Sequence, residues 1–204
     1  ALIVFALNFS SAQEVYLNLG RNFTTYDYTN SQGDSNPNVE SSSGASYEVG
    51  YIFPMGDKFG ITLGVDYIPF DADIDKRSIS QTSLGAAGAS SSGTNSVEGS
   101  VEDHYTLYIQ PGFMIKPSTM LYGTLGFASA TINGKSTSIT HTNINQDKDL
   151  EGTKIGVGIK HVYGSGLFVK ADYSQTDYDA VSFTTSNNTK ATADLDNTSF
   201  AISL

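Results

Sequence analysis

The chain has 204 residues, with 11 Lys and Arg against 21 Asp and Glu, which gives a net charge of −10. This acidic balance excludes nucleic acid as a partner, because no basic patch is available to neutralise phosphates. The sequence contains no Cys, which excludes a disulfide scaffold, a thiolate metal site and a cysteine nucleophile.

The N-terminal residues form a segment of their own. Ala1–Leu7 is a short apolar run, and the small residues Ser10 and Ala12 follow it in the small-x-small pattern of a signal cleavage site. We therefore expect residues 1–12 to be the remnant of a secretory signal peptide and residues 13–204 to form one domain. The alternative is that the apolar run is a first hydrophobic strand. No other stretch approaches the roughly 18 apolar residues of a membrane helix, so a membrane form would have to be a closed barrel.

From Glu14 onward, apolar residues fall at every second position, which is the periodicity of a β-strand. In the first run Val15, Leu17 and Leu19 share one parity, and Asn18 and other polar residues share the other. Eight such runs occur, and they cover residues 15–24, 46–53, 59–67, 105–113, 121–127, 154–160, 167–174 and 199–204. We therefore expect an all-β fold with an even number of strands.

The connections between these runs alternate in length. Short turns follow the second, fourth and sixth runs, at residues 54–58, 116–118 and 163–166. Long polar segments follow the first, third, fifth and seventh runs, at about residues 30–44, 71–100, 133–149 and 177–194. In an up-and-down sheet all four long segments, which we expect to be surface loops, emerge at one end. That asymmetry is typical of outer-membrane barrels, whose short turns face the periplasm.

The residue types on the two parities predict a barrel with its apolar face outward. The polar parity is rich in glycine and carries charges of both signs, which suits the crowded interior of a narrow barrel better than a solvated surface. Aromatic residues of the apolar parity gather near both ends of the runs, as in the two aromatic girdles of a membrane barrel. They are Phe53, Phe59, Phe113 and Tyr163 near the short turns, and Tyr47, Tyr67, Tyr105 and Tyr173 near the long segments.

The charged residues of the inward parity are the candidate site. Eight strands leave an interior just wide enough for side chains, and charges placed there must pair. We expect an interior network of Glu48, Asp66, Lys154, Lys160, Lys170 and Asp172, with Tyr108 and Tyr122 as hydrogen-bonding partners. The network is either a structural core or the gate of a small pore.

Two residues conflict with this scheme. Arg21 falls on the lipid-facing parity of the first run, where it either reaches the head groups or is turned inward by a bulge. Pro111 lies inside the fourth run, where a closed barrel offers no free edge for a residue without an N–H, so we expect a bulge near the periplasmic rim.

With these features, the chain resembles the small eight-stranded outer-membrane barrels: the opacity proteins, the OmpX type and the membrane domain of outer-membrane protein A. The resemblance covers about residues 13–204 and rests on the architecture and on strand texture such as Tyr47-Glu48-Val49-Gly50-Tyr51. It implies an eight-stranded antiparallel up-and-down transmembrane barrel in the bacterial outer membrane. Such proteins typically end in an aromatic residue, whereas this chain ends in Leu204.

For function, we expect a non-enzymatic surface protein that is structural, with loops that are either adhesive, as the resemblance to the opacity group implies, or an inert hydrophilic coat; the alternative is a small pore for solutes. His104, His141 and His161 are isolated and match no catalytic pattern, and the alternating carboxylates from Asp71 fail the EF-hand spacing. We therefore expect no catalytic, metal or cofactor site. The expected partners of this monomer are outer-membrane lipid, lipopolysaccharide and a surface ligand bound through the loops.

Overall fold

The computed structural model describes residues 7–8, 14–30, 40–69, 71–84, 90–137, 144–164, 167–184 and 190–204. Their secondary structure is antiparallel β-strand joined by turns. The strands are β1 (Leu7–Asn8), β2 (Glu14–Asn30), β3 (Glu40–Met55), β4 (Phe59–Ile68), β5 (Ala72–Leu84), β6 (Ser90–Lys116), β7 (Thr119–Thr137), β8 (Ile144–Val162), β9 (Phe168–Tyr178), β10 (Val181–Thr184) and β11 (Lys190–Ser203). No helix in the described part of the chain is long and apolar enough to cross a membrane.

Eight of these strands close into a ring. The order is β2-β3-β4-β6-β7-β8-β9-β11, and β11 pairs with β2 to complete the barrel. At the closure, Leu19 and Leu204 exchange backbone hydrogen bonds of 3.0 and 3.1 Å. The predicted eight-stranded antiparallel barrel is therefore confirmed. The remaining strands are additions to it, because β1 pairs with β2, β5 with β6 and β10 with β11.

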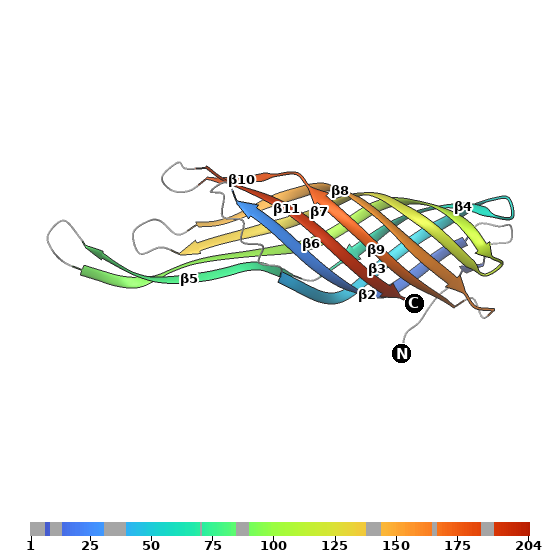
Figure 1. Ribbon diagram of the computed structural model, residues 1–204, viewed down its shortest axis with the longest axis horizontal. Helices are drawn as coiled ribbons and strands as arrows, with labels where there is room; N and C mark the ends of the chain where they lie inside the picture. The colour runs from blue at the N-terminus through green and yellow to red at the C-terminus, as the bar shows by residue number, and fades with distance from the viewer. Residues whose placement is uncertain are drawn as a thin grey trace.

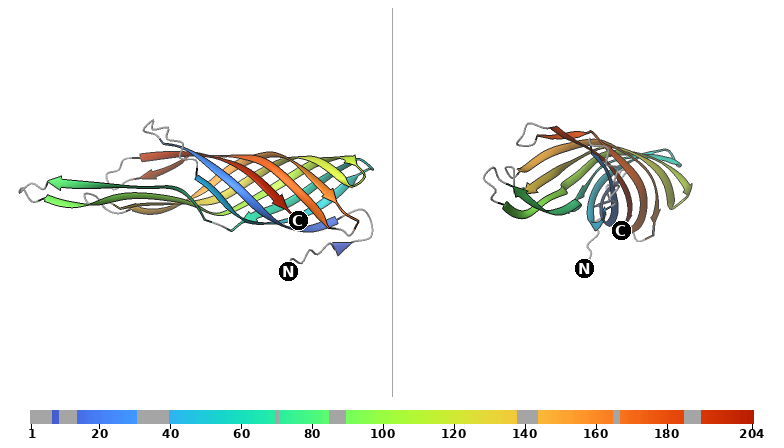
Figure 2. Two further views of the ribbon diagram at one scale, coloured as in Figure 1. Left: turned by 60° about the horizontal axis from the view of Figure 1, so that its bottom comes forward. Right: turned by 60° about the vertical axis from the view of Figure 1, so that its left-hand side comes forward.

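The barrel strands continue well beyond the closed part of the barrel. Figures 1 and 2 show the barrel at one end and hairpins extending from the other, of which the β5–β6 hairpin reaches farthest. The prediction of four long loops was therefore wrong for much of their length, since β5 and β6 together fill most of residues 72–100. These segments lack apolar alternation, but backbone hydrogen bonds between paired strands form with Ser, Thr and Asn as well as with apolar residues.

The predicted signal remnant lies mostly outside the described residues. Residues 1–6 and 9–13 are among those not described, and Leu7 and Asn8 pair with Val15 and Glu14 at the start of β2. The division at residue 12 stays a prediction. The expected loop residue His141 also lies outside the described residues.

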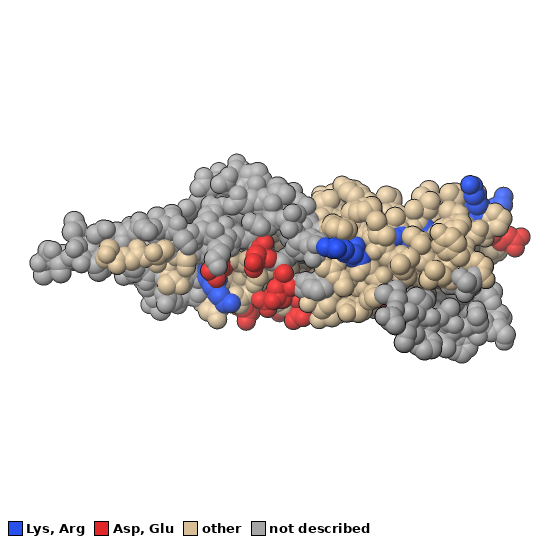
Figure 3. Space-filling view, turned by 90° about the horizontal axis from the view of Figure 1, so that it is seen from below, with Lys and Arg blue, Asp and Glu red and all other residues tan. Residues whose placement is uncertain are grey.

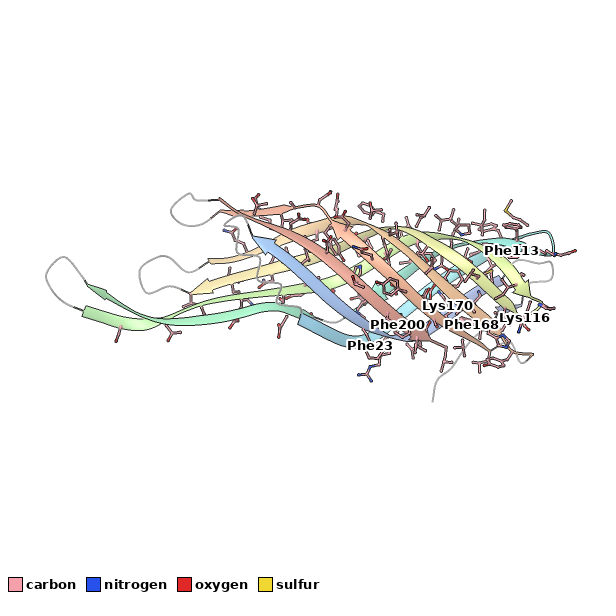
Figure 4. All side chains as sticks on the ribbon, viewed as in Figure 1. Phe23, Phe113, Lys116, Phe168, Lys170 and Phe200 are labelled. Atoms are coloured by element: carbon pink, nitrogen blue, oxygen red, sulfur yellow. The ribbon has the colours of Figure 1, made fainter. Side chains whose placement is uncertain are left out.

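The apolar parity faces outward, as the sequence predicts. In β6, Leu107 is 60% exposed, whereas its neighbours Thr106 and Tyr108 are buried. All eight aromatic residues of the two predicted girdles are exposed, as are Phe23 and Phe200, which Figure 4 labels with Phe113. Tyr67 pairs in register with both Tyr47 and Tyr105, so three of the outer tyrosines lie side by side on adjacent strands.

The two residues that conflicted with the pattern are both outward-facing and exposed. β2 pairs with β3 without a register shift at Arg21, so no bulge turns this side chain inward, and its guanidinium lies 5.3 Å from the centre of the Phe23 ring. Pro111 pairs in register with Ile61 of β4. The register does not shift at Pro111 itself. The register shifts between β6 and β7 fall at Glu102/Tyr105 and at Met114/Lys116, and the second lies beside the short turn, near the rim where a bulge was predicted.

The first of these shifts changes which residues face inward. Asp103 has a φ of 51°, in the left-handed region, and the register shifts around it. As a result Val101 and His104 both point inward although they differ in parity. Above this bulge the interior is apolar, and the buried cluster consists of Val101, Ala128, Ala130, Ile132, Leu150, Tyr178 and Leu195. The interior is therefore polar where the outer surface of the barrel is apolar. On the hairpin side of the bulge, the interior is apolar.

Candidate functional site

An ion pair between β3 and β9 lies at the centre of the barrel interior. The ammonium of Lys170, labelled in Figure 4, donates to both carboxylate oxygens of Glu48 at 2.6 and 2.8 Å. The Tyr108 hydroxyl also donates to Glu48, and Lys170 is only 2% exposed. Strand alternation places both side chains in the lumen, where they are buried. Each charge therefore depends on the other to offset the cost of its removal from water.

Asp172 extends this pair on the same strand. Its carboxylate lies 3.8 Å from the Lys170 ammonium and accepts a hydrogen bond of 2.5 Å from the Tyr122 hydroxyl. The Lys170 ammonium also lies 5.3 Å from the centre of the Tyr122 ring. One lysine therefore joins two carboxylates and two tyrosines, drawn from β3, β6, β7 and β9.

The other predicted charges lie beside this group. Lys154 of β8 pairs with Asp66 of β4 at 3.3 Å across the lumen. Lys160 is buried and sits opposite Lys170 in the β8–β9 register, but its ammonium lies 5.2 Å from the centre of the Phe168 ring. The structure thus gathers Glu48, Asp66, Lys154, Lys170 and Asp172, and Lys160 lies against the Phe168 ring.

Two polar residues of the interior were missed in the sequence. Asn18 donates to Glu48 at 2.6 Å and to Ser203 at 2.7 Å, which ties the network to the strands that close the barrel. Gln110 donates to Thr124 at 3.1 Å. Both lie on the polar parity of their strands, which was the available signal. A charged residue inside a barrel requires a partner of opposite charge, whereas an uncharged amide gives no such indication of its partner.

Glycine makes room for the two tyrosines. A Cβ atom added to Gly64 would collide with the Tyr108 hydroxyl, and one added to Gly158 would collide with the Tyr122 ring. These glycines on the inward parity thus have a specific cause. Each tyrosine ring occupies the space that a side chain at the paired position of the adjacent strand would need.

Little free space is left among these side chains. The cavity between Glu48, Asp66, Lys154 and Lys170 measures about 40 Å³. A water molecule needs roughly 10–15 Å³ by the same measure, so the cavity has room for a few waters and not for a solute. Within the described residues, no group of three or more His, Asp or Glu is arranged to hold a metal ion.

A second layer closes the lumen toward the hairpins. His104 is buried, and its Nε2 atom lies 3.2 Å from the Tyr178 hydroxyl and 3.4 Å from Thr106 Oγ1. Tyr178 belongs to the apolar cluster, in which Leu150 and Ala128 are completely buried. Packed apolar side chains thus cover the polar network on the side of the hairpins and form a plug there.

The outer surface above the aromatic girdle is acidic. Figure 3 shows Asp and Glu gathered where the barrel passes into the hairpins, with a Lys or Arg side chain among them, next to a barrel surface that carries a few Lys and Arg. Asp103, Asp149 and Glu151 line an open depression of about 430 Å³ together with Tyr67 and Tyr105. The Tyr67 hydroxyl donates to Asp103 at 3.1 Å, so the girdle and the acidic surface are in contact.

No curated protein sequence matches this chain. Among solved structures it is similar to Ail, the attachment invasion locus protein of Yersinia pestis, in complex with the heparin analogue sucrose octasulfate. In that comparison identity is 12%, coverage is 94% of this chain and 99% of that chain, and the TM-score is 0.49. It is also similar to the neisserial surface protein NspA, with 10% identity, coverage of 92% and 96%, and a TM-score of 0.36.

A third similar structure is the N-terminal β-barrel domain of Pseudomonas aeruginosa OprF, with 9% identity, coverage of 92% and 97%, and a TM-score of 0.26. Similarities this low carry no argument about function. The family comparison is decisive, since the model of the outer membrane protein beta-barrel domain matches residues 1–204. The chain therefore belongs to the outer membrane protein beta-barrel family of the Gram-negative outer membrane.

Proposed function

We propose that this protein is a non-enzymatic, non-conducting surface barrel that anchors a stiff set of β-hairpins outside the membrane for contact with a partner. The single observation that carries the proposal is the filled lumen. The cavity that the described residues line around Glu48 and Lys170 measures about 40 Å³, and the apolar cluster around Leu150 covers it on the outer side. Since transport needs a continuous passage, the function of such a barrel resides on its surface.

The hairpins support this proposal because they consist of regular paired β-strands rather than irregular loops. β6 runs for 27 residues and β7 and β8 for 19 each, so the strands that form the barrel continue into the outer part, and the β6–β7 ladder resumes beyond the register shift at Asp103. A ribbon held by ladder hydrogen bonds loses less entropy on binding a partner than a loose loop does.

The charge of the outer surface indicates the chemistry of the partner. Asp149 and Glu151 are exposed beside Asp103, and the whole chain carries a charge of −10. Such a surface repels polyanions, sulfated polysaccharides included, and attracts cationic groups. The proposed surface ligand is therefore basic, and the protein is proposed to act as a monomer.

The conduit remains the alternative function, favoured by the charges in the lumen. Single-channel recording in a planar bilayer separates the two, after the unboiled protein has been shown to migrate as a folded barrel. A silent membrane at high protein load is expected for a sealed barrel. Discrete, reproducible conductance steps would refute the sealed barrel and make Lys170 and Glu48 candidates for a gate.

The basic partner is tested separately. Refolded protein is titrated with a labelled oligolysine peptide and with heparin, at low and at physiological salt. Binding of the peptide alone, weakened by salt and by the variant Asp149→Asn/Glu151→Gln, is expected for an acidic contact surface. Preferential binding of heparin would contradict the proposed charge complementarity.

A further inference from the structure

A histidine lies on the inner side of the plug. The register shift around Asp103 turns His104 inward, and its side chain is only 3% exposed. The Nε2 atom lies 3.2 Å from the Tyr178 hydroxyl and 3.4 Å from Thr106 Oγ1. Nδ1 has no hydrogen-bond partner in the part of the chain that the structure describes. The ring is therefore held through one of its two nitrogen atoms.

This setting accepts a neutral imidazole and penalises a protonated one. A neutral ring has one N–H group, whereas a protonated ring has two and needs an acceptor for each. In the closed plug the second N–H of His104 would be buried without an acceptor, and its charge would be removed from water. The plug therefore closes most easily on the neutral form.

The charged groups near the ring do not compensate for this cost. On β6, Asp103 is exposed, and Glu102 accepts a hydrogen bond of 3.0 Å from a serine of the same strand. On β4, Asp66 is already paired with Lys154 at 3.3 Å. Lys154 of β8 also acts on His104 as a positive charge, which opposes a second positive charge on the ring.

The remaining strands around His104 contribute no described charge to the interior at this level. β7 and β11 contribute the apolar side chains of Ala128, Ala130 and Leu195, and β9 contributes the Tyr178 phenol. The nearby acidic residues of β8 and β9 are exposed; they are Asp149, Glu151 and Asp177. A protonated His104 would therefore be surrounded mainly by apolar groups.

Tyr178 is the part of the plug that can open with the least disruption. It is the last residue of β9, and it pairs with Gly152 at the end of the β8–β9 ladder. The β9–β11 ladder ends one residue earlier, at Asp177. The centres of the Tyr178 and His104 rings lie 6.1 Å apart in an edge-to-face arrangement. Strand ends open at a low free-energy cost, and displacement of Tyr178 would bring water to His104.

We propose that His104 and Tyr178 form an acid-sensitive latch on the plug, which is closed when the imidazole is neutral and opens when it is protonated. In the open state the ring is hydrated, and a hydrated imidazole takes up its proton at about pH 6.5. The open state therefore binds more protons than the closed state, so a fall in pH favours opening. Between pH 7.5 and pH 5 the ratio of open to closed molecules should rise about 30-fold.

The latch is independent of the proposed contact surface and of conduction. The ion pair of Glu48 and Lys170 lies below the plug and does not take part in the latch. Opening of the plug admits water to His104 but leaves the lumen around this pair filled. A bilayer that stays electrically silent in acid is therefore compatible with the latch, and the two proposals are tested separately.

The test uses a single cysteine, because the chain has none of its own. Val101 is 1% exposed within the plug, so the thiol of Val101→Cys reacts with 4,4′-dithiodipyridine only when the plug opens. Lys135→Cys is exposed on β7 and gives the reaction rate of an accessible thiol at each pH. The ratio of the two rates is expected to rise about 30-fold from pH 7.5 to pH 5, while unboiled samples still migrate as a folded barrel.

Three variants assign the response to the latch. His104→Gln stays polar but cannot be protonated, so the rise should shrink to less than about twofold. The matched control is His161→Gln, since His161 contacts Thr119 at 2.9 Å near a short turn and should leave the full rise unchanged. Tyr178→Phe removes the hydroxyl group at Nε2 and should raise the ratio about fivefold at pH 7.5, which tests the latch even if His104→Gln fails to fold.

Three outcomes would overturn the proposal. The first is a ratio that does not change with pH in the chain that retains His104. The second is an acid response that persists in His104→Gln, which would assign it to the carboxylates instead. The third is loss of the folded band in acid, which would mean that the whole barrel unfolds. An unchanged ratio in Tyr178→Phe at pH 7.5 would remove Tyr178 from the latch and overturn the pairing.

Discussion

The interior ion pair offers the sharpest test of how the barrel is stabilised. We propose that Glu48, Lys170 and Asp172 form a structural core rather than a gate. In Lys170→Met the side chain keeps much of its volume but loses a cation that lies 2.6 and 2.8 Å from Glu48 and 3.8 Å from Asp172. Two carboxylates then remain in the lumen, with the hydrogen bonds of Tyr108, Asn18 and Tyr122 as partial compensation.

Breaking a buried pair in this way typically costs about 3–5 kcal/mol, and we expect the free energy of unfolding to fall by that amount. In the double variant Lys170→Met/Glu48→Gln the isolated charge on Glu48 is also removed. Its loss should therefore be smaller than the sum of the two single losses, by about 1–3 kcal/mol.

The assay is urea unfolding in phospholipid vesicles, followed by the gel mobility of unboiled samples, because the chain has no Trp for fluorescence. Lys116→Met, an exposed lysine at a short turn that Figure 4 labels, is the matched control and should change stability by less than about 0.5 kcal/mol. A change as small in Lys170→Met, or strict additivity in the double variant, would refute the pairing argument.

Other substitutions test the packing and the backbone. Gly64→Val should lower the unfolding free energy by about 1–3 kcal/mol, because its side chain would overlap Tyr108, and unchanged urea unfolding would contradict this. Asp103→Val should cost about 1–2 kcal/mol at a φ of 51°, whereas Asp103→Gly should be nearly neutral; equal losses in the two would argue against backbone strain. Leu150→Ala should cost about 2–5 kcal/mol by leaving a cavity in the plug, whereas lipid-facing Leu125→Ala should cost under about 1 kcal/mol, and the reverse order would mean that the plug is not packed.

The closed barrel and the facing of its strands could be predicted because both depend on local alternation. Val15, Leu17 and Leu19 repeat with a period of two, and the same period places Glu48 and Lys170 on the inner face. Short turns such as residues 54–58 carry enough Gly and Pro to be recognised. These signals lie within a few residues of one another, so no knowledge of distant pairing is needed.

The pairing of the interior charges could not be predicted in this way. Glu48 and Lys170 are 122 positions apart, and their meeting depends on how far each strand is staggered against the next around the whole ring. Lys154 faces Asp66 for the same reason. The outer hairpins were missed because β5 and the start of β6 are rich in Ser, Thr and Gly, which read as loop, although ladder hydrogen bonds do not depend on side chains.

The long paired strands β6, β7 and β8 also determine how this protein can change in length. Side chains alternate along a ribbon, so an insertion or deletion of one residue within a hairpin arm exchanges the two faces of everything beyond it, up to the tip or the next bulge. An arm can therefore lengthen or shorten only by even steps, or at the cost of a new bulge like the one at Asp103. Variants of this surface should accordingly differ by any number of residues at the hairpin tips, but by pairs of residues between the tips and the membrane.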